Sequence, residues 1–295
     1  MDIQILQDYL TIIREGTISA AADQLRISQP ALSRRIRELE ETFGTELFQR
    51  GNRRITLTEE GQILQKRAEE ILQLLQITED EITHRKDRIN GVVRIGAGES
   101  RAFHYLSRTI KELQNHYPGI RFHIISGDTH DLMDELDHGL IDFAVVFSDF
   151  DRSIHMSLPL PESDRFGVLL RKDDPLADAE ILHLQDLKDR PLIISRASEA
   201  YISGLKDAEG LNIIGTYNLI YNASLLVEDG VCRALCFDNL INTTGDSPLY
   251  CVPLTPTLHT SGTLIWKKYQ VISPAVQLFI EHIRRQSDPC KEGTD

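Results

Sequence analysis

The segment between Ser28 and Gly44 constrains the fold more than any other part of the sequence. Ser28 is a residue type favoured at helix N-caps, and Pro30 fits the first turn of a helix, where a backbone N–H is not needed. Apolar residues then recur on one helical side, at Leu32, Ile36, Leu39 and Phe43. The pattern predicts a helix that buries this side and exposes the opposite one, which carries Gln29, Ser33, Arg34, Arg35 and Arg37.

Two shorter helical patterns precede this segment, and a hairpin pattern follows it. Residues 3–13 and 18–25 place apolar side chains at helical spacing. Residues 46–49 and 53–57 have the character of two short strands joined by a basic tip. The order is helix, helix, tight turn, basic helix and basic hairpin, which predicts an all-α winged helix-turn-helix over residues 1–58.

The exposed side of the third helix and the hairpin have the chemistry of a DNA-binding surface. A helix fits the major groove, where short neutral side chains such as Gln29 and Ser33 suit base edges. Arginines suit guanine or phosphate, and at a hairpin they suit phosphates or a narrow minor groove. The alternative is a three-helix bundle whose arginines only solvate one face. The candidate DNA-binding residues are Gln29, Pro30, Ser33, Arg34, Arg37, Arg50, Arg53 and Arg54.

A net charge of −13 does not favour nucleic acid as a partner, but the charge is unevenly distributed. Residues 24–58 carry seven arginines against four acidic residues, whereas residues 91–295 carry 19 basic and 29 acidic residues. Salt screens charges beyond about 10 Å, so a duplex responds to the local field at the contact. A basic patch beside an acidic body therefore binds a polyanion in one orientation.

A long motif runs through residues 16–61. Its pieces are Ala21-Ala22 with Leu25, Ser28-Gln29-Pro30-Ala31-Leu32-Ser33, Ile36, Leu39-Glu40, Gly44 through Leu47-Phe48-Gln49-Arg50, and Thr56-Leu57-Thr58-Glu59-Glu60-Gly61. This motif resembles the DNA-binding region of LysR-type transcriptional regulators. The resemblance implies that Gln29, Ser33 and Arg34 lie on the recognition helix. It also implies that Arg50 contacts the DNA backbone and that Arg53 and Arg54 form the wing.

A polar helix is predicted after the hairpin. Thr58 can cap its N-terminus, where Glu59 and Glu60 complement the positive end of the helix. Apolar residues then recur about every 3.5 positions, at Leu64, Ala68, Ile71, Leu75 and, after a gap at Thr78, Ile82. This period indicates a seam between paired helices, and the family resemblance implies pairing between subunits. The alternative is a single helix lying on its own domain. Residues 59–90 are thus expected to form a dimerisation helix and a hinge.

From Gly91 the pattern changes to alternating strands and helices. Such alternation predicts an α/β fold with a parallel sheet covered by helices. This part resembles the effector-binding half of the same family, which is similar to periplasmic binding proteins. The resemblance implies two α/β lobes, residues 91–161 with 267–295 and residues 162–266, with the chain crossing near 161 and returning near 267. The whole chain is then α/β, with an all-α N-terminal part and a linker helix.

The expected elements of these lobes follow from apolar runs and turn residues. In the first lobe they lie at residues 92–95, 101–116, 120–125, 129–139 and 143–147, with a last helix at 274–285. In the second lobe they lie at residues 166–170, 192–195, 198–205, 213–220 and 223–236, and the last of these is expected to be a helix.

A ligand is expected where strand C-termini and helix N-termini face the cleft between the lobes, because free N–H groups gather there. Three loops meet this condition, at residues 96–101, 126–130 and 195–196. Two arginines and several hydroxyls at helix starts suit a small anion such as a carboxylate. The alternative is that the polar side chains are ordinary helix caps and that both arginines are solvated. With Phe147 added by its position in the family, the candidate effector-binding residues are Ser100, Arg101, Ser126, Thr129, Phe147, Ser195, Arg196 and Asn222.

Two further clusters have alternative interpretations. Cys232 and Cys236 lie four apart on an expected helical face, which can hold a disulfide switch or a metal, but their apolar neighbours indicate core thiols. His130, Asp134 and His138 are also four residues apart, and one helical face carrying them could bind a metal. A solvated surface face is the simpler interpretation. No Gly-rich phosphate loop, HExxH or GxSxG motif is present. The sequence therefore predicts neither an enzyme nor a metal site.

The combined prediction is a sequence-specific, DNA-binding transcriptional regulator whose activity is modulated by a small-molecule effector. The expected partners are double-stranded DNA, an anionic co-inducer, and further copies of the chain in a homodimer or homotetramer. No resident cofactor is expected. Three alternatives come from other classes: a ligand-binding module that acts on a protein partner, an enzyme on the two-lobed fold, and a member of another winged-helix family that lacks the two lobes.

The predicted location is the cytoplasm, without a membrane partner. The first residues lack the basic pattern of a signal peptide, and the four cysteines are too few for a secreted disulfide scaffold. No apolar run reaches the roughly 18 residues that a membrane span needs.

Overall fold

The computed structural model describes residues 2–49, 55–83, 90–188, 190–255, 259–270 and 272–287. The chain divides into two compact units, Met1–Thr83 and His84–Asp295. Within the described residues, no helix combines the length and the hydropathy that crossing a membrane requires.

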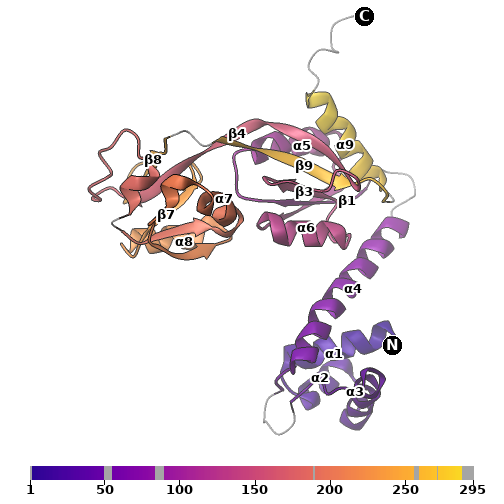
Figure 1. The fold of residues 1–295 in the computed structure, drawn as a ribbon. Helices are drawn as coiled ribbons and strands as arrows, with labels where there is room; N and C mark the ends of the chain where they lie inside the picture. Colours follow the sequence, from indigo (N-terminus) through magenta and orange to yellow (C-terminus); the bar gives the residue numbers. More distant parts are fainter. Residues whose placement is uncertain are drawn as a thin grey trace, which may run out of the picture. The chain divides into compact units, whose positions relative to one another are not determined.

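The helices of the first unit are α1 (Ile3–Glu15), α2 (Ile18–Leu25), α3 (Gln29–Phe43) and α4 (Glu59–Thr83) (Figure 1). The first three helices begin at capping side chains, those of Asp2, Thr17 and Ser28, which accept backbone N–H groups. α1 and α3 end at Gly16 and Gly44, whose φ angles of 72° and 69° lie in the left-handed region. The three helices predicted from the sequence are confirmed.

One apolar core joins these helices. It includes Leu6, Tyr9 and Ile12 of α1, Ala21 and Ala22 of α2, and Leu32, Ile36 and Leu39 of α3. The predicted apolar side of the third helix is therefore buried, except at Phe43, which is 47% exposed in the last turn. Burial of this side fixes which residues of α3 face outward.

The base of the predicted hairpin is present. Phe48 and Leu57 form an antiparallel bridge. The Glu40 carboxylate accepts the backbone N–H of Leu47 at 2.8 Å, which ties the hairpin to α3. The tip of the hairpin, with Arg50, Arg53 and Arg54, lies outside the described residues.

The first half of α4 packs on its own unit. Thr58 Oγ1 accepts the N–H of Gly61 at 3.0 Å and caps the helix as predicted. Leu64 and Ala68, the first two positions of the expected seam, are buried in the core of this unit. Over these two positions the alternative holds, because the helix lies on its own domain. The large apolar side chains that α4 exposes among the described residues are Ile63, Ile71 and Leu74.

The second unit contains all the strands of the described chain. They are β1 (Gly91–Ala97), β2 (Ile120–Ser126), β3 (Phe143–Val146), β4 (His155–Arg171), β5 (Leu192–Ser195), β6 (Ile213–Tyr217), β7 (Arg233–Phe237), β8 (Leu249–Pro253) and β9 (His259–Lys267). The helices are α5 (Phe103–His116), α6 (Thr129–Asp137), α7 (Glu199–Ser203), α8 (Ile220–Glu228) and α9 (Pro274–Ser287), with short 3₁₀ helices η1 (Leu184–Leu187), η2 (Arg196–Ser198) and η3 (Lys206–Ala208).

The long strand β4 is shared between two α/β lobes (Figure 1). The strand order is β2-β1-β3-β9-β4-β7-β5-β6, and β8 also pairs with β4. The first part of β4 pairs with β9, its last part pairs with β7 and β8, and the register shifts between Pro159 and Ser163. Here "first lobe" denotes β1–β3 and β9 with α5, α6 and α9, and "second lobe" denotes β5–β8 with α7 and α8.

Helices cover both faces of each sheet. In the first lobe, α5 and α9 pack on one face around Phe143 and Phe279, and α6 packs on the other through Leu132 and Leu136. In the second lobe, α8 packs on a face that includes Ala234 and the opposite face is covered by the segment around η1. The pairs β1–β2, β1–β3, β5–β6 and β5–β7 are parallel, as the alternation predicted.

The helix expected at residues 223–236 is wrong in its second half. α8 ends at Glu228, Gly230 has a φ of 74°, and Arg233–Phe237 form β7 between β4 and β5. Apart from Arg233, the run after Gly230 is apolar, as in a strand buried on both faces, and its periodicity does not distinguish such a strand from a helix.

Candidate functional site

The outward side of α3 is the candidate nucleic-acid interface of the first unit. Gln29, Pro30, Arg34 and Arg37 are exposed there, and Ser33 is half-buried. The N-terminal turn of the helix begins at Ser28, whose side chain accepts the N–H of Ala31. These residues lie in the first three turns of α3, the N-terminal part that reaches base edges when a helix enters the major groove.

Arg34 extends into solvent. Its Nε donates to Glu38 Oε1 at 2.8 Å, and 81% of its side chain is exposed. This hydrogen bond and the charge of Glu38 raise the pKa of Arg34. An exposed i,i+4 pair of this kind contributes little to stability, so a phosphate or a guanine can take the place of Glu38 at small cost.

Arg35 faces the other way and anchors the helix. Its Nη1 donates to Asp8 Oδ2 at 2.6 Å, and only 1% of the Asp8 side chain is exposed. Gln4 Nε2 donates to the other Asp8 oxygen at 3.0 Å. The Arg35–Asp8 pair therefore holds α3 on α1 and positions the recognition surface. No local sequence pattern indicated this pairing, because Asp8 lies on a different helix.

A cavity of about 390 Å³ in the second unit is the candidate effector site. It lies where β1 ends and α5 begins, beside the start of α8 and the chain after β7. Its walls are formed by Ala97, Gly98, Glu99, Ser100, Phe103, Ile124, Ser126, Ile220, Tyr221, Leu240 and Ile241. Of the eight candidate effector residues, Ser100 and Ser126 line it. Pockets of this size and apolar character are typical of small-molecule sites.

Glu99 lines the pocket but is not among the residues predicted from the sequence. Its Oε2 accepts the backbone N–H of Ile220 at 2.6 Å, so a first-lobe carboxylate meets the N-terminus of α8 in the second lobe. The Oγ of Ser100 is buried and has no hydrogen-bond partner among the described residues. A ligand in the pocket can satisfy this hydroxyl.

Asp164 of β4 occupies the start of α5. Its Oδ1 accepts the N–H of Arg101 at 2.8 Å, and the residue is 1% exposed. Burial raises the pKa of Asp164, although the N–H groups of Arg101 and Ala102 oppose the shift. The Arg101 side chain lines a different surface depression, with His104, Ser107, Arg108, Glu162 and Ser163.

Arg196 joins the two lobes rather than lining the pocket. At the start of η2, it donates to Asp128 and to Asp131, the latter at 2.6 Å. Asp128 is the N-cap of α6 and accepts the N–H of Asp131 at 3.1 Å. The arginine expected to hold an anion is therefore paired with two carboxylates of the chain itself.

The other candidate effector residues are not among the walls of this cavity. Phe147 packs against Phe237, with ring centroids 5.5 Å apart. Thr129 is the first residue of α6, and the N-cap of this helix is Asp128. The backbone carbonyl oxygen of Ser195 accepts a hydrogen bond from the Ser198 hydroxyl. Asn222 is exposed on α8.

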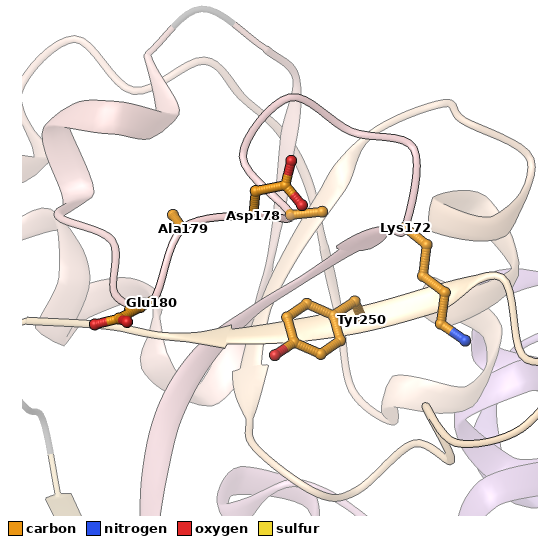
Figure 2. A pocket seen from close by; sticks show the side chains of 6 residues that line it. Lys172, Asp178, Ala179, Glu180 and Tyr250 are labelled. Atoms are coloured by element: carbon orange, nitrogen blue, oxygen red, sulfur yellow. The ribbon is translucent and has the colours of Figure 1, made fainter.

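A second cavity, of about 420 Å³, lies at the edge of the second lobe (Figure 2). It is lined by Lys172, Ala177, Asp178, Ala179, Glu180 and Tyr250. Tyr250 lies between Lys172 and Glu180 in this view. The mixed charges and the open surroundings give no convergent set of polar groups, and none of the predicted site residues is among these walls.

Cys232 and Cys236 are free and buried, as predicted for core thiols, but the expected helical face is wrong. Because Cys236 lies on β7, it does not share a helical face with Cys232. Its thiol is instead hydrogen-bonded to Cys251 of β8, on the other side of β4, and this bond together with burial raises the pKa of Cys236. A Cβ atom at Gly167 of β4 would lie 2.8 Å from Cys251 Sγ, so this glycine makes room for the thiols.

Among the residues that the structure describes, no group of three His, Cys, Asp or Glu side chains is arranged to hold a metal ion. His138 Nδ1 lies 2.7 Å from the carbonyl oxygen of Asp134 on its own helix. His130 is exposed.

Two family models match separate parts of the chain, one within each unit. Residues 3–62 match the family described as "Bacterial regulatory helix-turn-helix protein, lysR family". Residues 86–288 match the family described as "LysR substrate binding domain". Together the matches cover both units and most of the chain.

Two similar proteins carry related names. The uncharacterized HTH-type transcriptional regulator YfeR of Shigella flexneri is 24% identical over 98% of this chain and 96% of that protein. The uncharacterized HTH-type transcriptional regulator MJ0300 of Methanocaldococcus jannaschii is 30% identical over 70% of each protein.

Two solved structures have the same fold. HinK, a LysR family transcriptional regulator from Pseudomonas aeruginosa, is 25% identical over 97% of this chain and 99% of that chain, with a TM-score of 0.54. CbnR, a LysR family transcriptional regulator, is 18% identical over the same shares, with a TM-score of 0.74. The chain therefore belongs to the LysR family, and it is a transcriptional regulator with a DNA-binding helix-turn-helix region and an effector-binding α/β region, not an enzyme.

Proposed function

We propose that α3 enters the major groove of double-stranded DNA and that the hairpin after Gln49 contacts the DNA backbone. The observation that carries this proposal is the outward side of α3, where Gln29, Arg34 and Arg37 are exposed while the opposite side is buried. Base contacts are assigned to Gln29, Pro30, Ser33, Arg34 and Arg37, and backbone contacts to Arg50, Arg53 and Arg54. A structure of CbnR complexed with its target DNA has the same fold (TM-score 0.73, 18% identity over 97% of this chain and 99% of that chain), which supports the assignment.

The effector is assigned to the cavity between the lobes that contains Ser100 and Ser126. An effector changes DNA binding only if two arrangements of the lobes bind it with different affinity. Polar contacts that join the lobes include Glu99 to Ile220 and Arg196 to both Asp128 and Asp131. A ligand between Glu99 and Ile220 alters the first contact, so its binding energy can favour one arrangement of the lobes.

The proposed division of the chain is residues 1–58 for DNA binding and 59–90 for dimerisation and hinge. Residues 91–161 with 267–295 form one effector-binding lobe, and residues 162–266 form the other. The dimer contact is assigned to the exposed apolar side chains of α4. The rest of this helix is polar, so it offers these side chains little apolar surface to pack against within their own unit. A two-fold dimer places two recognition helices about 34 Å apart, or a multiple of that, on an inverted repeat. Since its target is DNA, the regulator acts in the cytoplasm.

Selection of DNA by the full chain tests the DNA-binding part of this proposal. Duplexes enriched from a random library are compared with a scrambled duplex by fluorescence anisotropy at fixed salt. The proposal expects affinity for the selected duplex to be about 10³-fold or more higher. Equal affinities for the two duplexes contradict sequence-specific binding and favour the alternative in which the chain acts on a protein partner.

A pocket variant tests the effector part. Ile241→Trp fills the cavity from the second lobe, and Glu180→Gln, in the wall of the other cavity, is the matched control. A small-molecule library is screened for compounds that change affinity for the selected duplex. The proposal expects active compounds to lose their effect in Ile241→Trp and to keep it in Glu180→Gln. Compounds that remain active in Ile241→Trp contradict this effector site.

A further inference from the structure

The interlobe pocket contains negative charge and no positive charge. None of its wall residues among the described part of the chain is lysine, arginine or histidine, and Glu99 is its one ionisable acid. The remaining polar groups are the hydroxyls of Ser100, Ser126 and Tyr221. The other walls are apolar, with the aromatic ring of Phe103 among them.

The helix N-termini around this pocket are already occupied by carboxylates of the chain. Asp164 accepts an N–H at the start of α5. Asp128 caps α6. Glu99 accepts the first N–H of α8. Helix N-termini attract anions because of their free N–H groups and positive dipole ends. Here that attraction is used within the protein, so it is not left for an anionic ligand.

The two arginines among the candidate effector residues do not supply a compensating charge. Arg196 pairs with Asp128 and Asp131. The Arg101 side chain lines a different depression. A ligand carboxylate in the pocket would meet Glu99 without a cation beside it, and two like charges at such short range in a partly desolvated site repel each other.

We propose that this pocket binds a small organic cation, an amine with an apolar body. The ammonium group pairs with Glu99 and donates a hydrogen bond to the Ser100 hydroxyl oxygen, and the aromatic side chains of Phe103 and Tyr221 favour a cation further. The body fills the apolar walls of Ile124, Leu240 and Ile241. This inference rests on the proposed effector site and replaces the anionic ligand expected from the sequence.

Three probes of similar size test the charge preference: 2-phenylethylamine, 2-phenylethanol and phenylacetate. Calorimetric titration of each into the full chain, at up to about 10 mM for compounds of this size, is expected to show binding of the amine at least about tenfold tighter than of phenylacetate. Glu99→Gln keeps an oxygen acceptor for the Ile220 N–H while removing the charge. It is expected to weaken amine binding about tenfold and to leave binding of the alcohol within about twofold.

Controls separate this inference from the effector site itself. Glu180→Gln removes one carboxylate elsewhere in the second lobe and is expected to leave all three affinities unchanged. Phenylacetate binding that equals or exceeds amine binding, and that Ile241→Trp abolishes, overturns the cation preference while retaining the pocket. Equal binding of amine and alcohol, or no amine binding, also overturns the preference. Amine binding that is the same in Ile241→Trp and in the unmodified chain overturns the pocket.

Discussion

The Arg196 guanidinium donates to the carboxylate of Asp128, and this contact connects the second lobe to the first. Asp128 is 3% exposed in its side chain, whereas Arg196 is 48% exposed. Burial by itself raises the pKa of Asp128, but the hydrogen bond from Arg196 and the N–H of Asp131 outweigh it and lower the pKa overall. The Asp128 carboxylate therefore caps α6 and accepts the hydrogen bond from Arg196 at the same time. It remains ionised at pH values below the ordinary pKa of an aspartate.

Arg196→Ala is expected to loosen this contact between the lobes. The pair is half-exposed, so its removal is expected to cost about 1 kcal/mol of unfolding free energy, measured by urea denaturation. Hydrogen exchange at residues 126–131 is expected to accelerate. Arg171→Ala is the matched control, because Arg171 pairs with Asp173 within one lobe and both side chains are exposed. Equal protection of residues 126–131 in the two variants contradicts a contact between the lobes.

The same carboxylate gives a pH dependence with a defined sign. A lowered folded-state pKa means that the stabilisation from Asp128 is fully present above the ordinary aspartate value of 3.8 and is lost as the pH falls through the lowered value. Asp128→Asn retains capping ability and removes the titration. The difference in unfolding free energy between the unmodified chain and this variant is expected to be constant from about pH 5 to 7 and to shrink below pH 4. A difference that grows on acidification contradicts the assigned shift.

Arg34→Ala is expected to weaken DNA binding without destabilising the first unit. If Arg34 contacts a base, the binding free energy for the selected duplex weakens by roughly 1–3 kcal/mol. If it contacts a phosphate, the slope of log affinity against log salt concentration becomes shallower by about 1. Lys111→Ala removes one exposed positive charge from α5 and controls for net charge. Anisotropy at several salt concentrations separates these outcomes. Unchanged affinity at physiological salt excludes either role for Arg34.

Arg35→Ala, one position further along α3, is expected to act through stability. Its removal leaves the buried Asp8 carboxylate with only the Gln4 amide among the hydrogen bonds described above. Because 44% of the Arg35 side chain is exposed, the expected loss is at the lower end of about 1–3 kcal/mol of unfolding free energy. Thermal unfolding of the full chain measures it. A variant as stable as the unmodified chain contradicts an anchoring role for Arg35.

Local patterns predicted the helices of the first unit because caps, glycines and apolar spacing agree there. Ser28, Leu32 and Gly44 each give a signal that depends on neighbours in sequence. The pairing of Arg35 with Asp8 had no such signal, since it depends on how α3 crosses α1. Leu64 and Ala68 fit a dimer seam and an internal core equally well by spacing, and only the tertiary structure shows that they are buried within their own unit.

The candidate effector-site residues were likewise predicted only where the signal is local in sequence. Ser100 and Ser126 were found because loops after parallel strands converge at one edge of a sheet. Glu99 was missed, because an acidic residue in such a loop gives no local sign that it reaches α8. The prediction of an anionic ligand treated the arginines as free charges. The pairing of Arg196 with Asp128 could not be predicted, because the two residues lie far apart in sequence. The β7 strand was missed because its residues, apart from Arg233, are apolar on both faces, a pattern that a buried helix shares.

Gly61→Ala is expected to destabilise the junction between the hairpin and α4. A Cβ atom at this position would lie 2.2 Å from the carbonyl oxygen of Leu47, which is backbone and cannot swing aside. Overpacking of this kind costs about 1–3 kcal/mol. Gly215→Ala in β6 is the control, because nothing lies within 4 Å of its added Cβ. Urea denaturation of both variants is the measurement, and equal losses contradict a specific close contact at Gly61.

The thiol of Cys236 is expected to resist alkylation in the folded protein. Its hydrogen bond with Cys251 and its burial raise its pKa, and the thiolate is the form that reacts. Labelling with iodoacetamide at pH 8 followed by peptide mass analysis is expected to modify Cys236 at least about tenfold more slowly than in the urea-unfolded chain. Cys251→Ala removes the hydrogen-bond partner but keeps Cys236 buried, so it should accelerate labelling only partly. Labelling of native Cys236 as fast as that of the unfolded chain contradicts the assigned environment.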